Sequence, residues 1–356
     1  MRIGLIAPPF LPVPPPSYGG TELVIDVLAR GMQEAGHDVR LFTVGESTCP
    51  VPSDWWYAHA VEPMGLGAAE ATQVTAAYRE LADVDVVHDH TLLGPLAFGG
   101  RVGRPVVTTC HSPFTADLRQ VYAQIADRVP IVAISQSQRA CAPGLPISRV
   151  IHHGLDLRQY APGTDSGYLL FLARMSADKG PHRAIQIARA SGRKLVIAAK
   201  MREPDERAFF RATVEPQLGP DVRFVGEVTF AERVRLLQGA AALLNPIEWP
   251  EPFGLNMLEA LACGTPVLTL RHGAAPEIVA DGLTGFVRGQ AEELVECVDR
   301  LSQIDRSDCR AEAQRRFSMQ RMVDDYLEVY TDAISGDCGG DWPVQPELGM
   351  LGAHVT

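Results

Sequence analysis

The sequence predicts an α/β protein made of two Rossmann-like domains, each built on a doubly wound parallel sheet. The chain has 356 residues, which is more than one domain usually needs. Short apolar segments alternate with helical ones, as in parallel strands that are buried on both faces. This alternation pauses at the polar residues 162–167 and then starts again. Ligands of such sheets bind at the carboxyl ends of the strands, so we expect the binding site in the cleft between the domains.

The first domain is expected to span residues 1–160. It opens with an apolar strand at residues 3–7, followed by a proline-rich loop at 8–16. Thr21 is a suitable N-cap for the helix that follows, and Gly36 is a suitable residue for its end. Further strands are predicted at residues 39–44, 84–88, 106–109 and 131–134.

The second domain is expected to span residues 161–316. Strands are predicted at residues 168–173, 195–199, 223–225, 241–245 and 266–270, and helices at 181–190, 230–237 and 254–262. A last helix at 317–334 has apolar side chains at helical spacing and is expected to complete the first domain. Residues 336–356 are rich in Gly and Pro and lack periodicity, which predicts a disordered tail.

The composition is typical of a folded protein and narrows its function. Hydrophobic residues make up 46% of the chain and charged residues 21%. A formal net charge of −11 argues against a nucleic-acid partner, because proteins that bind nucleic acids usually present a basic surface. The seven cysteines are scattered and include no C-x-x-C pair, so neither a zinc site nor a disulfide framework is expected. No apolar run is long enough for a signal peptide or a transmembrane segment, and we expect a cytoplasmic protein.

The most informative stretch begins at Glu251 and ends at Glu259. Gly254 lets the backbone approach a ligand, and the helix that follows offers free amides suited to a diphosphate. Glu259 lies farther along that helix, where its carboxylate can accept both hydroxyls of a ribose, and Glu251 can reach a sugar hydroxyl. The competing interpretation is that both glutamates are solvated surface residues, which is the usual state of a glutamate. Their apolar and Gly/Pro context argues against it.

Two cations form a second candidate group. Arg174 ends the first strand of the second domain, and Lys179 precedes the next helix. Cations at the carboxyl end of a strand can neutralise a departing diphosphate. The alternative is a solvated surface pair.

Histidines gather at two strand ends of the first domain. His88, His90 and His111 could hold a metal, but a strand alternates faces and no acidic fourth ligand is evident. We therefore expect a hydrogen-bonding role in the cleft for His111 and a satisfied core position for one of the other two. Gly19 and Gly20 follow the first strand and suggest a close backbone approach to a ligand, or a turn that needs glycine. Their spacing is not the G-x-G-x-x-G fingerprint of dinucleotide sites.

These pieces together resemble the family 4 retaining glycosyltransferases of the GT-B fold, over nearly the whole chain to about residue 335. The matching segments, in order, are Tyr18-Gly19-Gly20-Thr21-Glu22, His111, Ala133-Ile134-Ser135, residues 150–156, Arg174 with Lys179-Gly180, Val225-Gly226-Glu227, Glu251 to Glu259, and Pro276-Glu277-Ile278-Val279. Each segment alone is a weak signal, whereas the ordered set is highly specific.

The resemblance implies roles for individual residues. Arg174 and Lys179 would bind the donor diphosphate, Glu259 would hold the ribose, and Glu251 and His111 would contact the transferred sugar. The segments that would approach the donor through backbone are Gly19, Gly20, Phe253, Gly254 and Leu255. The family needs no metal or other cofactor, retains the anomeric configuration, and uses a nucleotide diphosphate sugar that is most often a UDP-sugar.

The chain also departs from the family pattern. It has His152-His153-Gly154 where many members have Pro-Asn-Gly, and we interpret His153 as a linker histidine rather than a pocket residue. It has Ala173-Arg174-Met175 where Gly-Arg-Leu is frequent, which keeps the cation. The acceptor remains unidentified: it is expected to be a small molecule, a glycan or a secondary metabolite, bound by loops 11–17 and 49–65 with their aromatic residues Trp55, Trp56 and Tyr57.

Two other functions compete with a glycosyltransferase. A nucleotide-sugar or NAD-dependent oxidoreductase or epimerase would use the same scaffold, but the chain lacks the glycine fingerprint and a Tyr-x-x-x-Lys pair. An inert sugar-binding homologue would keep the fold without the activity, because fold alone does not determine function. Donor hydrolysis would separate this last possibility from an active enzyme.

Overall fold

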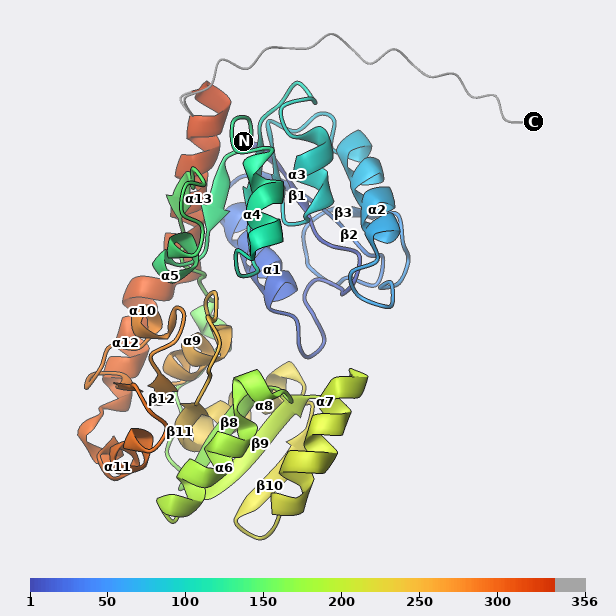
Figure 1. The fold of residues 1–356 in the computed structure, drawn as a ribbon. Coiled ribbons are helices and arrows are strands. Elements are labelled where there is room, and N and C mark those ends of the chain that lie inside the picture. Colours follow the sequence, from blue (N-terminus) through green and yellow to red (C-terminus); the bar gives the residue numbers. More distant parts are fainter. Residues whose placement is uncertain (337–356) are drawn as a thin grey trace.

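The computed structural model describes residues 1–336. Apart from Gly336, the tail expected at residues 336–356 lies outside the described residues. The chain forms two parallel sheets, each covered by helices on both faces, so the predicted α/β class with two doubly wound sheets is confirmed (Figure 1). Within the described residues, no helix is both long and apolar enough to cross a membrane.

The first sheet has seven parallel strands in the order β3-β2-β1-β4-β5-β6-β7. Its strands are β1 (Arg2–Ile6), β2 (Asp38–Thr43), β3 (Ser53–Trp55), β4 (Val86–Asp89), β5 (Val106–Thr109), β6 (Ile131–Ala133) and β7 (Arg149–Val150). The sequence predicted five of them. It missed β3 and β7, which are edge strands of three and two residues and carry too few apolar side chains to show a pattern.

The second sheet has six parallel strands in the order β10-β9-β8-β11-β12-β13. Its strands are β8 (Tyr168–Arg174), β9 (Lys194–Lys200), β10 (Val222–Gly226), β11 (Ala240–Asn245), β12 (Val267–Leu270) and β13 (Gly285–Arg288). All but the edge strand β13 were predicted. In both sheets the strand order reverses direction beside the first strand of the series, β1 or β8, which is where a doubly wound sheet opens a crevice at its carboxyl edge.

The helices fill the connections between these strands. They are α1 (Gly20–Glu34), α2 (Gly67–Glu80), α3 (Leu93–Phe98), α4 (Ala116–Ala123), α5 (Gln136–Ala140), α6 (Pro181–Ala190), α7 (Pro204–Phe209), α8 (Phe230–Gly239), α9 (Leu255–Ala262), α10 (Ala275–Ile278), α11 (Glu293–Asp299), α12 (Arg306–Phe317) and α13 (Met319–Ser335). The predicted helix at residues 181–190 is α6 with the same bounds.

The expected cap of the first helix is wrong. Helix α1 begins at Gly20, and its N-cap is Gly19, which has no side chain to cap it. A side chain at Gly19 would collide with Pro15 of the preceding loop, so the tight packing of that loop decides where the helix starts. Thr21 consequently lies inside the first turn.

The last predicted helix, at residues 317–334, is α13, and it starts two residues later than expected, at Met319. Phe317 ends α12, and Ser318 then starts α13 by accepting a hydrogen bond from the Arg321 amide at 3.3 Å. Serine is a preferred N-cap, so the break has a local cause that the apolar spacing does not reveal.

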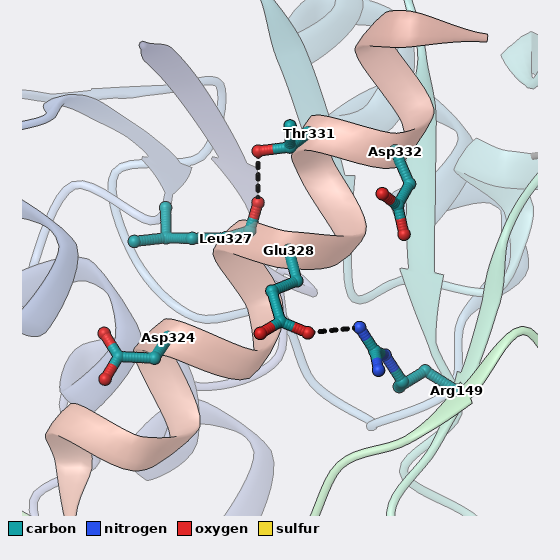
Figure 2. Close-up of a pocket in the computed structure, with 6 residues that line it drawn as sticks. All are labelled: Arg149, Asp324, Leu327, Glu328, Thr331 and Asp332. Atoms are coloured by element: carbon teal, nitrogen blue, oxygen red, sulfur yellow. Dashed lines mark hydrogen bonds and ion pairs between the residues drawn. The ribbon is translucent and has the colours of Figure 1, made fainter. Parts of the chain in front are cut away.

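Helix α13 packs on the first sheet although it follows the second in the sequence (Figure 1). Met322, Val323, Tyr326 and Tyr330 are buried in the core that α1 shares, and Val323 lies against Gly31 of α1. On its outer side, Glu328 forms an ion pair with Arg149 of β7 (Figure 2). The C-terminal helix therefore contributes core to the first half of the molecule.

Candidate active site

A cleft lies at the carboxyl ends of the two sheets. Its volume is ≈ 630 Å³, which is within the usual size of small-molecule sites. The ten residues expected to bind the donor and its sugar all line it: Gly19, Gly20 and His111 from the first half, and Arg174, Lys179, Glu251, Phe253, Gly254, Leu255 and Glu259 from the second. The aromatic residues expected to bind the acceptor, Trp55, Trp56 and Tyr57, are not among the residues that line it. The structure thus brings together groups that are up to 240 positions apart in the sequence.

Lys179 and Glu251 form an ion pair at the floor of the second half. Lys179 lies in a short 3₁₀ turn (Ala177–Lys179) and is 8% exposed, and its ammonium contacts the Glu251 carboxylate. Trp249 supports both partners: its indole Nε1 donates to Glu251 Oε2 at 3.1 Å, and its ring centroid lies 4.7 Å from Lys179 Nζ. Because the pair is removed from solvent, the interpretation of Lys179 and Glu251 as solvated surface residues is wrong.

Arg174 is held more loosely than Lys179. It ends β8, and its guanidinium is 3.6 Å from the Asp178 carboxylate, with each side chain about one third exposed. Such a contact contributes little to stability. Arg174 therefore keeps its hydrogen-bonding capacity for a ligand in the cleft.

Glu259 is buried on α9, with 3% of its surface exposed, so the solvated-helix interpretation is wrong for this residue too. Arg233 of α8 lies 3.1 Å from Glu259 Oε1, and the Tyr160 hydroxyl donates to the same oxygen at 3.0 Å. Within residues 1–336, Oε2 accepts no hydrogen bond, so it is available to a ligand. Arg233 and Tyr160 could not be predicted from the sequence, because nothing near them marks them as partners of Glu259.

The start of α9 supplies backbone donors. Gly254 precedes the helix with φ +101°, a left-handed conformation that favours glycine. The predicted first residue of this helix, Gly254, is its N-cap, and Leu255 is the first helical residue. Gly20 of α1 lies against Leu255, because a Cβ at Gly20 would be 3.3 Å from Leu255 Cδ1. The N-termini of α1 and α9 therefore meet at the cleft, and both direct free amides and positive helix ends there.

The histidines of the first half behave differently from one another. His88 is fully buried, and its Nδ1 and Nε2 make hydrogen bonds to the hydroxyls of Tyr330 (2.7 Å) and Thr109 (2.8 Å). It is the satisfied core histidine that we expected. His90 Nδ1 is 2.9 Å from His111 Nε2, and among the described residues no group of three side chains is arranged to hold a metal. Burial lowers the pKa of His111 to about 4 and that of His88 to about 3, which keeps both rings neutral at pH 7.

His153 lines the cleft, so its interpretation as a linker histidine is wrong. It is 3% exposed and stacks on His111 at a centroid distance of 5.4 Å, with its ring edge-on to Phe253 at 4.9 Å. Burial, followed by the neighbouring His111, holds the pKa of His153 well below its ordinary value. The chain thus places an imidazole where the resemblance pattern has asparagine.

Its neighbour His152 helps to join the two halves. The His152 ring makes a 2.8 Å hydrogen bond to Glu277, which follows β12 in the second half. Glu277 also accepts the amides of Gln136 and Ser137 at the start of α5, at 2.9 and 2.7 Å. One carboxylate therefore ties α10 to the first sheet, a role that gives the Pro276-Glu277-Ile278-Val279 segment a structural reason.

A second bridge between the two halves also lines the cleft. Arg202 pairs with Glu227 at 2.7 Å, and the Ser17 hydroxyl donates to Glu227 at 2.5 Å. Arg233, which holds Glu259, also donates to the Ser17 carbonyl at 2.9 Å. Ser17, which follows the proline-rich loop of the first half, is therefore in direct contact with α8 of the second half.

Glu22 is a cleft residue that the sequence analysis did not single out. It lies in the first turn of α1, is 5% exposed, and stands beside Gly19. Burial raises the pKa of the Glu22 carboxyl to about 7. Only its place in the Tyr18-to-Glu22 segment pointed to it.

Comparison with known proteins identifies the family. The family model “Glycosyltransferase Family 4” matches residues 18–159, and “Glycosyl transferases group 1” matches residues 155–317. Glycogen synthase of Mycobacterium tuberculosis is 29% identical over 300 residues, covering 71% of this chain and 70% of the relative. D-inositol 3-phosphate glycosyltransferase of Mycolicibacterium smegmatis is 27% identical over 323 residues, covering 76% and 71%.

The solved structure of AviGT4, a glycosyltransferase involved in avilamycin A biosynthesis, is 27% identical with a TM-score of 0.69, covering 94% of this chain and 98% of that one. Anabaena Alr3699/HepE, solved with UDP-glucose, has a TM-score of 0.74 at 19% identity, covering 93% and 100%, and supports the fold alone. The two family models together run from residue 18 to residue 317, and they meet between the two sheets. With its GT-B fold and these matches, the chain belongs to the family 4, or group 1, glycosyltransferases.

Proposed function

We propose that this chain transfers a sugar from a nucleotide diphosphate donor, a UDP-sugar, to a hydroxyl group of its acceptor with retention of the anomeric configuration. The observation that supports this most is the convergence of the residues expected to bind the donor on one cleft, where the N-termini of α1 and α9 meet the cations Arg174 and Lys179. Glycosyl transfer on a diphosphate donor needs this arrangement, because negative charge grows on the leaving group.

The donor would lie against the second half. Glu259 Oε2 would accept the ribose hydroxyls while Arg233 and Tyr160 hold the carboxylate in place. Arg174 and Lys179 would bind the diphosphate, with the amides of α9 beside them. Glu251 and His111 would contact the sugar from opposite walls, and Gly20 would approach the donor with its backbone.

The chemistry would rest on positioning and charge stabilisation. As the bond between sugar and diphosphate breaks, positive charge develops on the sugar ring and negative charge on the leaving oxygens. The proton of the acceptor hydroxyl would pass to the departing diphosphate on the same face, which retains the configuration. The cations of the cleft supply the charge that a metal supplies in other transferases, so we propose that the reaction needs no metal or other cofactor.

The first test is donor binding. The melting temperature of the protein is measured with UDP, GDP, ADP and dTDP, each at about 100 times its Kd, where mass action adds about 2.7 kcal/mol and raises the melting temperature by several degrees. We expect the largest rise with UDP. No response to any of the four would overturn the donor assignment, and a larger rise with another nucleotide would correct the base.

The second test is the stereochemistry of transfer. An α-linked donor is expected to give an α-linked product, read from the anomeric proton coupling in the NMR spectrum, at an unchanged rate in excess EDTA. A β-linked product would contradict retention, and loss of the rate with EDTA would contradict metal independence. Donor binding without hydrolysis or transfer would instead support the inert homologue.

The similarity to AviGT4 supports a secondary-metabolite acceptor.

A further inference from the structure

The two walls of the cleft differ in charge. Among the described residues that line it, all five cationic side chains come from the second half: Arg174, Lys179, Lys200, Arg202 and Arg233. Each lies near an acidic partner, which is Asp178, Glu251, Glu206, Glu227 and Glu259 respectively. The first half contributes no lysine or arginine to the lining, and its charged residue there is Glu22.

The histidines of the first-half wall do not supply the missing positive charge. Burial lowers the pKa of His111 to about 4, and that of His153 lies well below its ordinary value. Both rings are therefore neutral at pH 7. They can exchange hydrogen bonds with hydroxyl groups, but they offer little attraction to a phosphate or carboxylate.

Glu22 also counters the one element of this wall that attracts anions. The positive end of α1 lies at Gly20, and Glu22 places a carboxyl group in the same turn. Glu22 is 5% exposed, its carboxyl group accepts a hydrogen bond from its own backbone amide, and it makes no ion pair within residues 1–336. Its neighbours Leu11 and Gly19 are uncharged, whereas a buried carboxylate normally has a cationic partner.

From this geometry we infer that the first-half wall binds an uncharged, hydroxyl-bearing acceptor, and that Glu22 accepts a hydrogen bond from one of its hydroxyls. A phosphorylated acceptor would bring its anion to a wall with no lysine or arginine to balance it, and beside a carboxyl group that is partly ionised at pH 7. The site would therefore distinguish acceptors in two ways: Glu22 accepts a hydrogen bond from a hydroxyl group, and its carboxylate repels a phosphate. The inference rests on the proposed function, because it names the acceptor class of the same cleft.

A purely structural role for Glu22 is the alternative. A glutamate at the third position of a helix can bond to the free amides of the first turn, and such a residue would stabilise α1 without meeting a ligand. Glutamine can cap in the same way but carries no charge, so Glu22→Gln separates the two roles. Glu34→Gln, at the exposed end of the same helix, is the matched control.

The experiment compares matched acceptors. UDP release from a UDP-sugar is measured with pairs that differ by one phosphate, beginning with myo-inositol and myo-inositol 3-phosphate, then glucose and glucose 6-phosphate, and further pairs until one member supports transfer. We expect the neutral member to have a kcat/KM at least about tenfold higher than its phosphate. In Glu22→Gln we expect the acceptor KM of the neutral member to rise by about 10–100-fold, the usual loss for a hydrogen bond to a charged group, with the donor KM shifting far less. Glu34→Gln should retain wild-type constants.

Three results would overturn the inference: a phosphorylated member that is the better substrate, a Glu22→Gln variant with a wild-type acceptor KM, or equal losses for both substrates together with a lower melting temperature. These differ from failure of the proposed function, which would show as absence of nucleotide binding in the wild-type protein before any acceptor is added.

Discussion

The two walls of the cleft differ in whether their buried charged groups are paired. The second-half wall carries cations, and nearby carboxylates balance them, as in Lys179 with Glu251 and Arg233 with Glu259. The first-half wall carries neutral imidazoles and one carboxyl group without a cation. A buried charge is tolerated when it is paired and is otherwise pushed toward its neutral form. This difference fits the proposal that the second half binds a charged donor and the first half an uncharged acceptor.

Removing the cation Lys179 from the second-half wall should have the largest effect on activity. Lys179→Met removes the cation that would stabilise the departing diphosphate, and we expect kcat to fall by roughly 10³-fold, as for loss of other transition-state donors. The measurement is initial-rate transfer or donor hydrolysis, with circular dichroism to verify folding. Lys194→Met, which changes the exposed lysine at the start of β9, is the control.

Loss of the buried partner can also lower stability, because the Glu251 carboxylate would lose the cation that pairs with it. Lys179→Arg preserves the charge and should remain folded, but it cannot place a compact ammonium at the same point. A variant of either kind with near-normal kcat would show that the second-half wall is not the diphosphate site.

Loss of Arg233, which orients the Glu259 carboxylate, should have the next largest effect on activity. Arg233→Met removes the guanidinium that orients the carboxylate, and we expect the donor KM to rise by about 10–100-fold, since hydrogen bonds to charged groups contribute about 1.5–3 kcal/mol. The exposed neighbour Arg235 on the same helix provides the control as Arg235→Met. An unchanged donor KM would mean that Glu259 does not hold the nucleotide.

The unpaired carboxyl group of the first-half wall should make the protein less stable as the pH rises. The pKa of Glu22 is about 7 in the folded protein and about 4.5 when unfolded, so folding favours its protonated form. The stability that the Glu22 carboxyl contributes to the folded state is fully present below pH 4.5 and is lost as the pH rises through 7. We expect Glu22→Gln to be more stable than the wild type at pH 8 by about 1–3 kcal/mol and equally stable at pH 4.5.

Thermal or urea unfolding across pH 4.5–8 measures this difference. A variant that is less stable than the wild type at every pH would show instead that Glu22 stabilises α1 as a cap.

The histidines of the same wall should respond to pH with the opposite sign. The pKa of His111 is about 4 when folded and about 6.5 when unfolded, so folding favours its neutral form. Its contribution is present above pH 6.5 and is lost as the pH falls toward 4. Between pH 7 and pH 4.5, the free energy of unfolding of His111→Gln should therefore fall by about 1–2 kcal/mol less than that of the wild type, after allowance for the partial exposure of His111. Identical unfolding curves would show that His111 is no more buried than a surface histidine.

Much of the central part of each sheet could be predicted from sequence. Strands such as β5 and β8, and helix α6, carry enough apolar residues at one spacing to be recognised alone. The edge strands β3 and β7 were missed because each carries a single apolar side chain, and the edge strand β13 was not recognised in the sequence. The boundary at Ser318 was missed for a related reason, since apolar spacing does not reveal a cap.

The sequence by itself determined the doubly wound class and the residues that converge on the cleft, because strand and helix periodicity and the position of Glu251, Lys179 or Gly254 after a strand are local properties of the chain. Tertiary structure alone decided the partners: Arg233 and Tyr160 for Glu259, His111 for His153, and a wall free of cations for Glu22. Ionisation and hydrogen bonding depend on which groups meet through space and on how far water is excluded, and packing of distant segments determines both.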